Sequence, residues 1–199
     1  MSVDTLTTFF ALLTVLSNVA VVVAVVLWIG GLFSPAVAEV GARLRDSLSG
    51  SALALAWSVA AVSMAGSLYY SEIAHIPPCL LCWYQRIAMY PLAIILGIAA
   101  IKKDVGIRIY ALVLAGVGTI IATYHYQLER FPDQTSIACR LDTPCSTTTI
   151  WKFHYVSFPF MAISGFLVIA VLLMIARAPQ ELEGDDVDDE DALLPEERG

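Results

Sequence analysis

Five long stretches of apolar residues constrain this chain more than any other feature of its sequence. They cover residues 6–33, 52–70, 77–101, 107–127 and 155–176, and Arg86 is the one charge inside them apart from Arg108 near an end. A bilayer core about 30 Å thick needs about 20 residues of apolar helix, so each stretch is long enough to cross it. The chain is 58% hydrophobic and 15% charged, which excludes an ordinary soluble domain with about 25% charged residues. The sequence predicts an all-α polytopic membrane protein.

Basic residues gather between alternate stretches and set the predicted orientation. Seven of the 11 Lys and Arg fall on one side of a five-span topology: Arg43, Arg45, Lys102, Lys103, Arg108, Arg177 and Arg198. The positive-inside rule places that side in the cytoplasm. We therefore expect a multi-pass protein of the cell membrane with an extracytoplasmic N-terminus and a cytoplasmic C-terminus. Residues 1–50 are expected to form a transmembrane helix followed by a cytoplasmic loop that carries Arg43 and Arg45.

The two ends of the chain need separate interpretations. Residues 179–199 hold ten of the 18 acidic residues and one of the 11 basic ones, which predicts a disordered acidic tail. No basic region suits nucleic acid. Ala36-Val37-Ala38 resembles a signal-peptide cleavage site, but Asp4 precedes the apolar run and the run is longer than a signal core of 7–15 residues. We expect the first helix to be retained.

The four cysteines form two short pairs, Cys79 with Cys82 and Cys139 with Cys145. On the predicted topology both pairs are extracytoplasmic, where disulfides persist. Three interpretations fit. A structural zinc site needs four thiolates, and the second pair has poor spacing for it. Two static disulfides remain possible, as does a redox relay, which the Cys-x-x-Cys motif favours because it lowers the pKa of one thiol.

The residues around the first pair favour the relay. Pro77 and Pro78 suit only the first turn of a helix, so the pair lies at a helix N-terminus, where the dipole and free amides stabilise a thiolate. Arg86 follows Cys82 by four residues and shares its helical face, and Tyr90 continues that face. A cation inside a membrane helix is a functional candidate. The alternative is an arginine that snorkels to the interface, which would not need to share a face with Cys82.

A thiolate, a cation and aromatic rings on one membrane-embedded face suit an apolar electron acceptor with polar carbonyl groups. A quinone fits that description. Arg86 would donate a hydrogen bond to the quinone oxygen and stabilise negative charge as it develops. We therefore expect a membrane quinone, menaquinone or ubiquinone, as the cofactor, and no metal.

The segment from Pro78 to Pro91 resembles the active-site segment of the disulfide bond formation protein B (DsbB) family, especially its BdbC-like branch. Two further segments resemble the second cysteine loop, the last helix and the end of the helix before the loop, and the resemblance extends over residues 52–176. The matching residues are Pro78-Cys79-Leu80-Leu81-Cys82-Trp83-Tyr84-Gln85-Arg86-Ile87, Met89-Tyr90-Pro91, Tyr124-His125, Phe131-Pro132, Thr143-Pro144-Cys145-Ser146, Trp151 and Ser157-Phe158-Pro159-Phe160.

This resemblance implies a four-helix redox domain over residues 51–178 and a quinone-dependent protein-disulfide oxidoreductase. Such a protein reoxidises a DsbA-type carrier of thioredoxin fold and delivers the electrons to a membrane quinone. By position, Cys139 is the cysteine that the carrier attacks and Cys145 is its partner. Cys79 and Cys82 form the quinone-proximal pair, in which Cys82 contacts the quinone. Arg86 matches the family arginine four residues after the second cysteine, and His125 matches a histidine implicated near the quinone.

The chain departs from the family pattern in its first span and its acidic tail, which are both additional. Two alternatives to the resemblance remain. A vitamin K epoxide reductase-like protein also joins a quinone to cysteine pairs, although the Cys-Trp-Tyr-Gln-Arg run that starts at Cys82 argues against it. A structural membrane protein would hold two static disulfides and would not consume quinone.

Overall fold

The computed structural model describes residues 3–132 and 151–177, and within these ranges the chain is helical apart from short connections. A π-helical turn, Tyr69–Ile73, continues α3, and a 3₁₀ turn, Val105–Ile107, leads into α5. A single bridge between Lys152 and Val156 closes the turn before α6. The helices are α1 (Val3–Phe33), α2 (Pro35–Ser49), α3 (Ala52–Leu68), α4 (Leu80–Lys102), α5 (Arg108–Arg130) and α6 (Phe158–Ile175).

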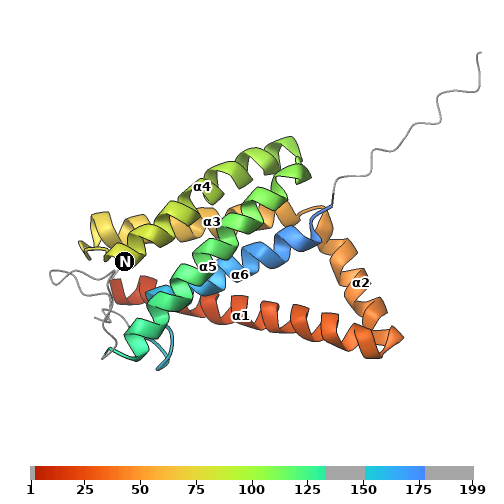
Figure 1. The fold of residues 1–199 in the computed structure, drawn as a ribbon, viewed down its shortest axis with the longest axis horizontal. Coiled ribbons are helices and arrows are strands. Elements are labelled where there is room, and N and C mark those ends of the chain that lie inside the picture. The colour runs from red at the N-terminus through yellow and green to blue at the C-terminus, as the bar shows by residue number, and fades with distance from the viewer. Residues whose placement is uncertain (1–2, 133–150, 178–199) are drawn as a thin grey trace, which may run out of the picture.

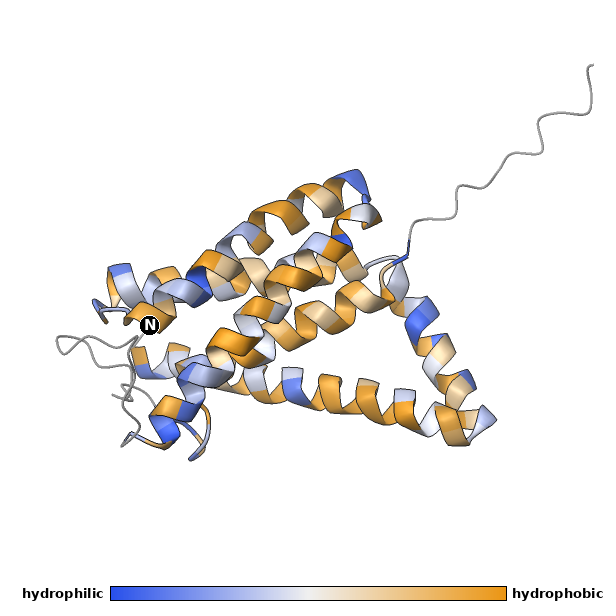
Figure 2. Ribbon diagram, viewed as in Figure 1, coloured by the Kyte–Doolittle hydropathy of each residue, from blue (hydrophilic) through white to orange (hydrophobic). Residues whose placement is uncertain are grey.

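Five helical segments in the described part of the chain are long and apolar enough to cross a membrane. They are Val3–Phe33, Ala52–Ile73, Leu80–Lys102, Val105–Arg130 and Phe158–Ile175. Figure 2 shows that their central turns are hydrophobic and that hydrophilic residues gather near the ends and along α2. In a bilayer the backbone must satisfy its own hydrogen bonds, which favours helices for such segments. The prediction of an all-α polytopic membrane protein is confirmed.

Helices α3, α4, α5 and α6 form a four-helix bundle in which each helix packs on two neighbours. The neighbouring pairs are α3 with α4, α4 with α5, α5 with α6, and α6 with α3. Helix α1 lies outside this ring: its N-terminal part packs against α6, and its C-terminal part diverges from α6 toward α2, as Figure 1 shows. The predicted four-helix core with one extra N-terminal helix is therefore confirmed.

Small residues let the bundle helices approach closely. The fully buried core includes Ala56 and Ala60 of α3 and Ala115 of α5. Gly118 of α5 faces Phe166 of α6 so closely that a Cβ atom there would lie 2.3 Å from the ring. Packing of this kind replaces the hydrophobic effect as the source of helix association in lipid.

The segment that was predicted as a cytoplasmic loop is instead helix α2, so that prediction was wrong. Pro35 occupies the first turn, where its fixed φ suits a helix. Arg43 and Glu39, four residues apart, form an ion pair of 2.6 Å, which supports an exposed helix. Alanine, leucine and arginine also have high helix propensity. The helix was not predicted because this segment is too short and too polar to span a bilayer, and it was therefore interpreted as a loop.

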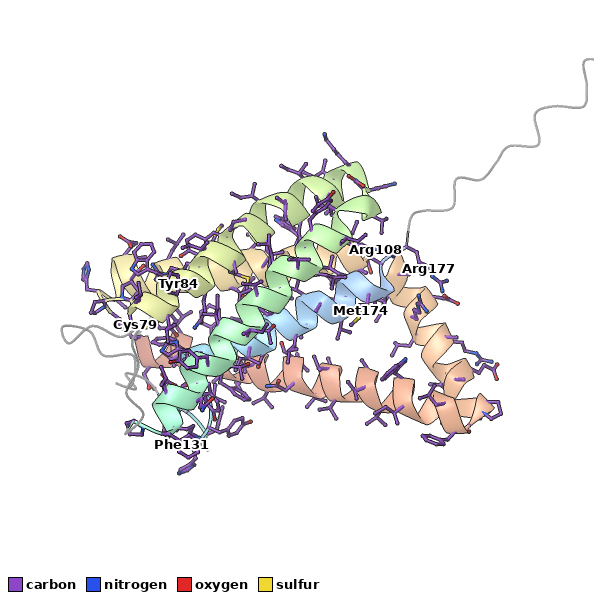
Figure 3. The ribbon with its side chains drawn as sticks, in the orientation of Figure 1. Cys79, Tyr84, Arg108, Phe131, Met174 and Arg177 are labelled. Atoms are coloured by element: carbon purple, nitrogen blue, oxygen red, sulfur yellow. The ribbon has the colours of Figure 1, made fainter. Side chains whose placement is uncertain are left out.

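The bundle has two chemically different ends. Figure 3 shows Cys79 and Phe131 at one end, and Arg108, Met174 and Arg177 at the other. The N-terminal part of α1 lies at the Cys79 end, where Asp4 pairs with Lys152 at 2.6 Å. Arg177 pairs with Asp46 of α2 at 2.8 Å at the opposite end. The cysteine end and the arginine end therefore face opposite sides of any bilayer that the bundle spans.

Candidate active site

Cys79 and Cys82 occupy the start of α4, as the two prolines before them indicated. Cys79 is the N-cap residue, and its Sγ accepts a hydrogen bond of 3.3 Å from the backbone N–H of Cys82. The two Sγ atoms lie 3.0 Å apart, and both cysteines are free thiols. Cys79 is buried and Cys82 is partly exposed. The structure thus presents the first pair in its dithiol form.

His125 of α5 lies against Cys79. Its Nε2 is 3.6 Å from Cys79 Sγ, and its Nδ1 is 2.9 Å from Nε2 of Gln85. With the amide nitrogen of Gln85 at Nδ1, the ring accepts there and its hydrogen lies on Nε2, directed at the sulfur. The imidazole is buried, with 3% exposed. The resemblance associated His125 with the quinone, whereas its direct contact in the structure is with a cysteine.

The surroundings of Cys79 favour its thiolate. Cys79 precedes the membrane-spanning part of α4. A hydrogen bond from the Cys82 thiol, and after it the His125 imidazole and the Cys82 backbone N–H, lower the pKa of the Cys79 thiol to about 4 against the opposing effect of burial. A thiol at a helix N-terminus beside a histidine is a reactive type of cysteine. These contacts therefore favour Cys79 as the nucleophile of the reduced pair.

Arg86 and Tyr90 lie on the α4 face below the cysteines, and both bind to the same residue of α3. Nη2 of Arg86 donates to the backbone oxygen of Ser67 at 3.0 Å, and the Tyr90 hydroxyl donates to Ser67 Oγ at 3.3 Å. The Arg86 guanidinium also stacks on the Trp83 ring, 5.2 Å from its centroid. A single backbone acceptor leaves most of the guanidinium donors for another partner. Ser67 thus orients both side chains.

All five of these predicted site residues, Cys79, Cys82, Arg86, Tyr90 and His125, line one cavity of about 640 Å³. The cavity is bounded by α1, α3, α4, α5 and α6. Polar side chains such as Arg86 and His125 share its lining with apolar walls from residues such as Leu13, Val59 and Phe166. The other two predicted residues, Cys139 and Cys145, lie outside the described residues, as does the predicted acidic tail.

Three features of the cavity were not predicted. Gln85 belongs to the Cys-Trp-Tyr-Gln-Arg run, yet its contact with His125 joins residues 40 positions apart. Glu129 also lines the cavity, and its Oε2 is buried without a hydrogen-bond partner among the described residues. The spacing of His125 and Glu129, four residues on one helix, was the available signal. Phe10 and Thr14 of α1 line the cavity as well, and nothing in their apolar context marked them.

The thiols and the imidazole could also hold a metal ion. One ligand atom each from Cys79, Cys82 and His125 lies within 4.8 Å of the others. Two sulfurs and one nitrogen are a donor set that zinc accepts. The same atoms form the dithiol site, so a bound ion would block thiol exchange.

The sequence comparisons agree on one family. The model of the family described as "Disulfide bond formation protein DsbB" matches residues 49–176. A probable disulfide formation protein of Oceanobacillus iheyensis is 44% identical over 128 residues, which are 63% of this chain and 88% of the relative. No solved structure gives a significant match.

Two further relatives match this chain over a similar length. The probable disulfide formation protein C 2 of Bacillus anthracis is 42% identical over 129 residues, 65% of this chain and 92% of its own. The disulfide bond formation protein C of Bacillus subtilis is 41% identical over 122 residues, 61% of this chain and 88% of its own. The match contains α3 to α6 and the cysteine pair at the start of α4. The chain belongs to the DsbB family of membrane disulfide oxidoreductases, which function in disulfide bond formation.

Proposed function

We propose that this protein oxidises a thioredoxin-like carrier of the DsbA type outside the cytoplasm and passes the electrons to a membrane quinone. The observation that carries the proposal is the common cavity of Cys82, Arg86 and His125, placed at one end of a membrane-spanning bundle. In this position a dithiol meets the lipid phase, where a quinone dissolves.

The cavity fits a quinone in size and in chemistry. Its volume of about 640 Å³ lies within the range of about 300–1,000 Å³ that is usual for small-molecule sites. Arg86 offers guanidinium donors beside the apolar walls, which suits a flat ring with carbonyl oxygens. When bound, a quinone would supply an acceptor for two electrons and two protons.

The chain's own residues carry out the thiol–disulfide exchange steps. We assign the entry step to Cys139: one carrier thiolate attacks its sulfur and breaks the Cys139–Cys145 bond, and the second carrier thiol then attacks the mixed disulfide, so that the carrier leaves as a disulfide and Cys139 and Cys145 are left as thiols. The reduced outer pair then reduces a Cys79–Cys82 disulfide by the same exchange, which gives the dithiol found at the start of α4. Oxidation of that dithiol releases two electrons and two protons. Nε2 of His125, 3.6 Å from Cys79 Sγ, carries the hydrogen that it donates to the sulfur, and so it stabilises the thiolate formed when the Cys79 thiol loses its proton.

The position of the outer pair supports this order. Residues 133–150, which contain Cys139 and Cys145, connect Phe131 to Trp151. Figure 3 shows Phe131 at the same end of the bundle as Cys79. We place this end outside the cytoplasm, because the opposite end carries Lys102, Lys103 and Arg177.

The test is a quinone-reduction assay with the purified protein, a reduced DsbA-type carrier and a soluble decyl quinone. We expect quinone absorbance to fall as the carrier is oxidised, and Cys82→Ser to abolish the change. Carrier oxidation without loss of quinone would contradict the acceptor. Quinone loss driven by a small dithiol but not by the carrier would contradict the partner. If the protein showed no redox activity with any donor, a structural role with static disulfides would be supported instead.

A further inference from the structure

Helix α1 lies outside the part of the chain that is shared with the relatives. The family match covers residues 49–176 and so begins after α1, and the relatives from Oceanobacillus iheyensis and Bacillus anthracis match 63% and 65% of this chain. Yet α1 packs along α6 of the bundle. The additional helix is therefore attached to the shared family unit by contacts that this chain supplies itself.

Polar contacts fix the register of α1 against the bundle at three positions along the helix. Near its start Asp4 pairs with Lys152. One turn further, the buried Tyr70 hydroxyl donates to Thr7 Oγ1 at 2.9 Å. Deeper still, Ser164 Oγ donates to Asn18 Oδ1 at 3.2 Å. Side-chain hydrogen bonds between helices specify association where lipid provides no hydrophobic driving force, so one face of α1 is held toward α3 and α6.

That face of α1 lines the cavity of the cysteine pair. Phe10, Leu13, Thr14 and Ser17 all contribute to the lining, and their spacing places them on one side of a helix. Phe10 lies over Gly66 of α3 so closely that a Cβ atom on Gly66 would meet the ring at 2.6 Å. The opposite face is exposed and carries Phe9, Leu12 and Leu16.

The position of these side chains along the cavity gives them different neighbours. Gly66, under Phe10, precedes Ser67, which holds Arg86. Phe10 therefore borders the cavity at the level of the guanidinium. Thr14 and Ser17 lie further along α1, away from the cysteine end, where Ser58 and Val62 of α3 complete the wall.

We propose that α1 is a wall of the quinone site and determines which quinones the protein uses. Phe10 bounds the ring beside Arg86, and the trough past Leu13, Thr14 and Ser17 accommodates the first part of the prenyl tail. This inference rests on the proposed function, because it concerns the acceptor of that same site. It assigns to the extra helix a substrate-binding role that the four-helix unit of the relatives does not include.

The first test compares two neighbouring phenylalanines. Phe10→Ala removes a side chain from the cavity wall, whereas Phe9→Ala removes one from the exposed face. Binding to the purified protein is measured by equilibrium dialysis with 2,3-dimethoxy-5-methylbenzoquinone and with its decyl derivative, and quinone reduction is measured alongside. Because Phe10 bounds the ring, we expect Phe10→Ala to weaken binding of both quinones and to raise their KM about tenfold, since tenfold corresponds to the loss of about 1.4 kcal/mol of contact. Phe9→Ala should match the wild type.

A second pair of variants tests the trough without removing packing. Ser17→Leu fills the cavity from α1, and Ala20→Leu adds the same bulk to the exposed face of the helix. Ser17→Leu should reduce use of the decyl quinone while it leaves the tail-less quinone unaffected, and Ala20→Leu should affect neither. Equal behaviour of all four variants and the wild type would overturn the role of α1. A wild-type protein that neither binds nor reduces any quinone would instead overturn the proposed function.

Discussion

Cys79 Sγ lies 3.6 Å from His125 Nε2, although 46 residues separate them in the chain. The contact joins the start of α4 to the end of α5, so the reactivity of the cysteine pair depends on the packing of two helices and not on the Cys-x-x-Cys motif alone.

The first prediction concerns the pH dependence of this thiol. The pKa of Cys79 is lowered from about 9 to about 4, so the thiolate's contribution to the stability of the reduced protein is complete above about pH 9 and is lost as the pH falls toward 4. His125→Ala removes one stabilising partner and should shift the midpoint of the pH dependence of Cys79 alkylation upward from about pH 4. Mass spectrometry of iodoacetamide-treated protein measures the rate. An unchanged pH profile in His125→Ala would remove the imidazole from this role.

The second prediction is that Arg86 serves quinone reduction and not folding. Arg86→Ala should lower kcat/KM for quinone about ten- to a hundredfold, because a hydrogen bond to a charged group contributes about 1.5–3 kcal/mol. Arg86→Lys should recover part of the loss, since an ammonium retains the charge but not the planar fork. The control is Arg108→Ala at the opposite end of the bundle. Normal quinone kinetics in a folded Arg86→Ala protein would make Arg86 an interfacial anchor.

The third prediction separates the two cysteine pairs. Cys139→Ser should block reaction with the carrier while Cys79 and Cys82 remain oxidisable by quinone, and Cys82→Ser should leave the outer pair reducible but prevent its reoxidation. A carrier without its resolving cysteine traps the mixed disulfide. If the trapped carrier were linked to Cys79 and not to Cys139, the proposed order of exchange would be reversed.

The fourth prediction concerns the orientation in the membrane. A reporter fused after Arg177 should behave as cytoplasmic, and after treatment with a reductant an impermeant thiol reagent should label Cys139 and Cys145 from outside intact spheroplasts. Labelling of Cys139 from the cytoplasmic side only would contradict both the orientation and the encounter with an extracytoplasmic carrier.

The fifth prediction compares two glycines. Gly66→Ala would bring a Cβ atom within 2.6 Å of Phe10 and should destabilise the detergent-solubilised protein by about 1–3 kcal/mol. At Gly116 of α5 an added Cβ meets nothing within 4 Å, so Gly116→Ala should be neutral or stabilising by up to about 1 kcal/mol. Thermal unfolding of the two variants gives the difference. A destabilised Gly66→Ala protein that Phe10→Ala restores would locate the clash at α1.

The transmembrane helices were predictable because a segment that crosses lipid must be a long apolar helix, and long apolar stretches can be recognised directly in the sequence. The dithiol site was predictable in part for a similar reason: Pro78 fixes the start of α4, and the spacing of Cys82, Arg86 and Tyr90 fixes a common face. Contacts between helices could not be recognised from apolar stretches or from residue spacing. The hydrogen bond between Gln85 and His125 depends on how α4 packs on α5, which a single sequence does not specify.

The residues of α1 that line the cavity were also not predictable from the sequence. Its residues are apolar on the face toward lipid and nearly so on the face toward the cavity, so periodicity could not distinguish Phe9 from Phe10. Helix α2 was missed for a different reason, since a charged segment between two spans was interpreted by its length and charge, while its i,i+4 pairing of Glu39 with Arg43 was not weighed.

The packing of α1 on α6 joins the first and the last of the described helices, so it forms late in the synthesis of this part of the chain. The Asn18–Ser164 contact joins residues 146 positions apart and closes only after the residues between them have been translated. Until then the first helix has no bundle surface to hold it beside α3. A chain that stalls before α6 would therefore carry the complete Cys79–Cys82 motif in an open, unwalled site, and the order of translation itself delays assembly of a competent redox centre until the whole membrane domain is inserted.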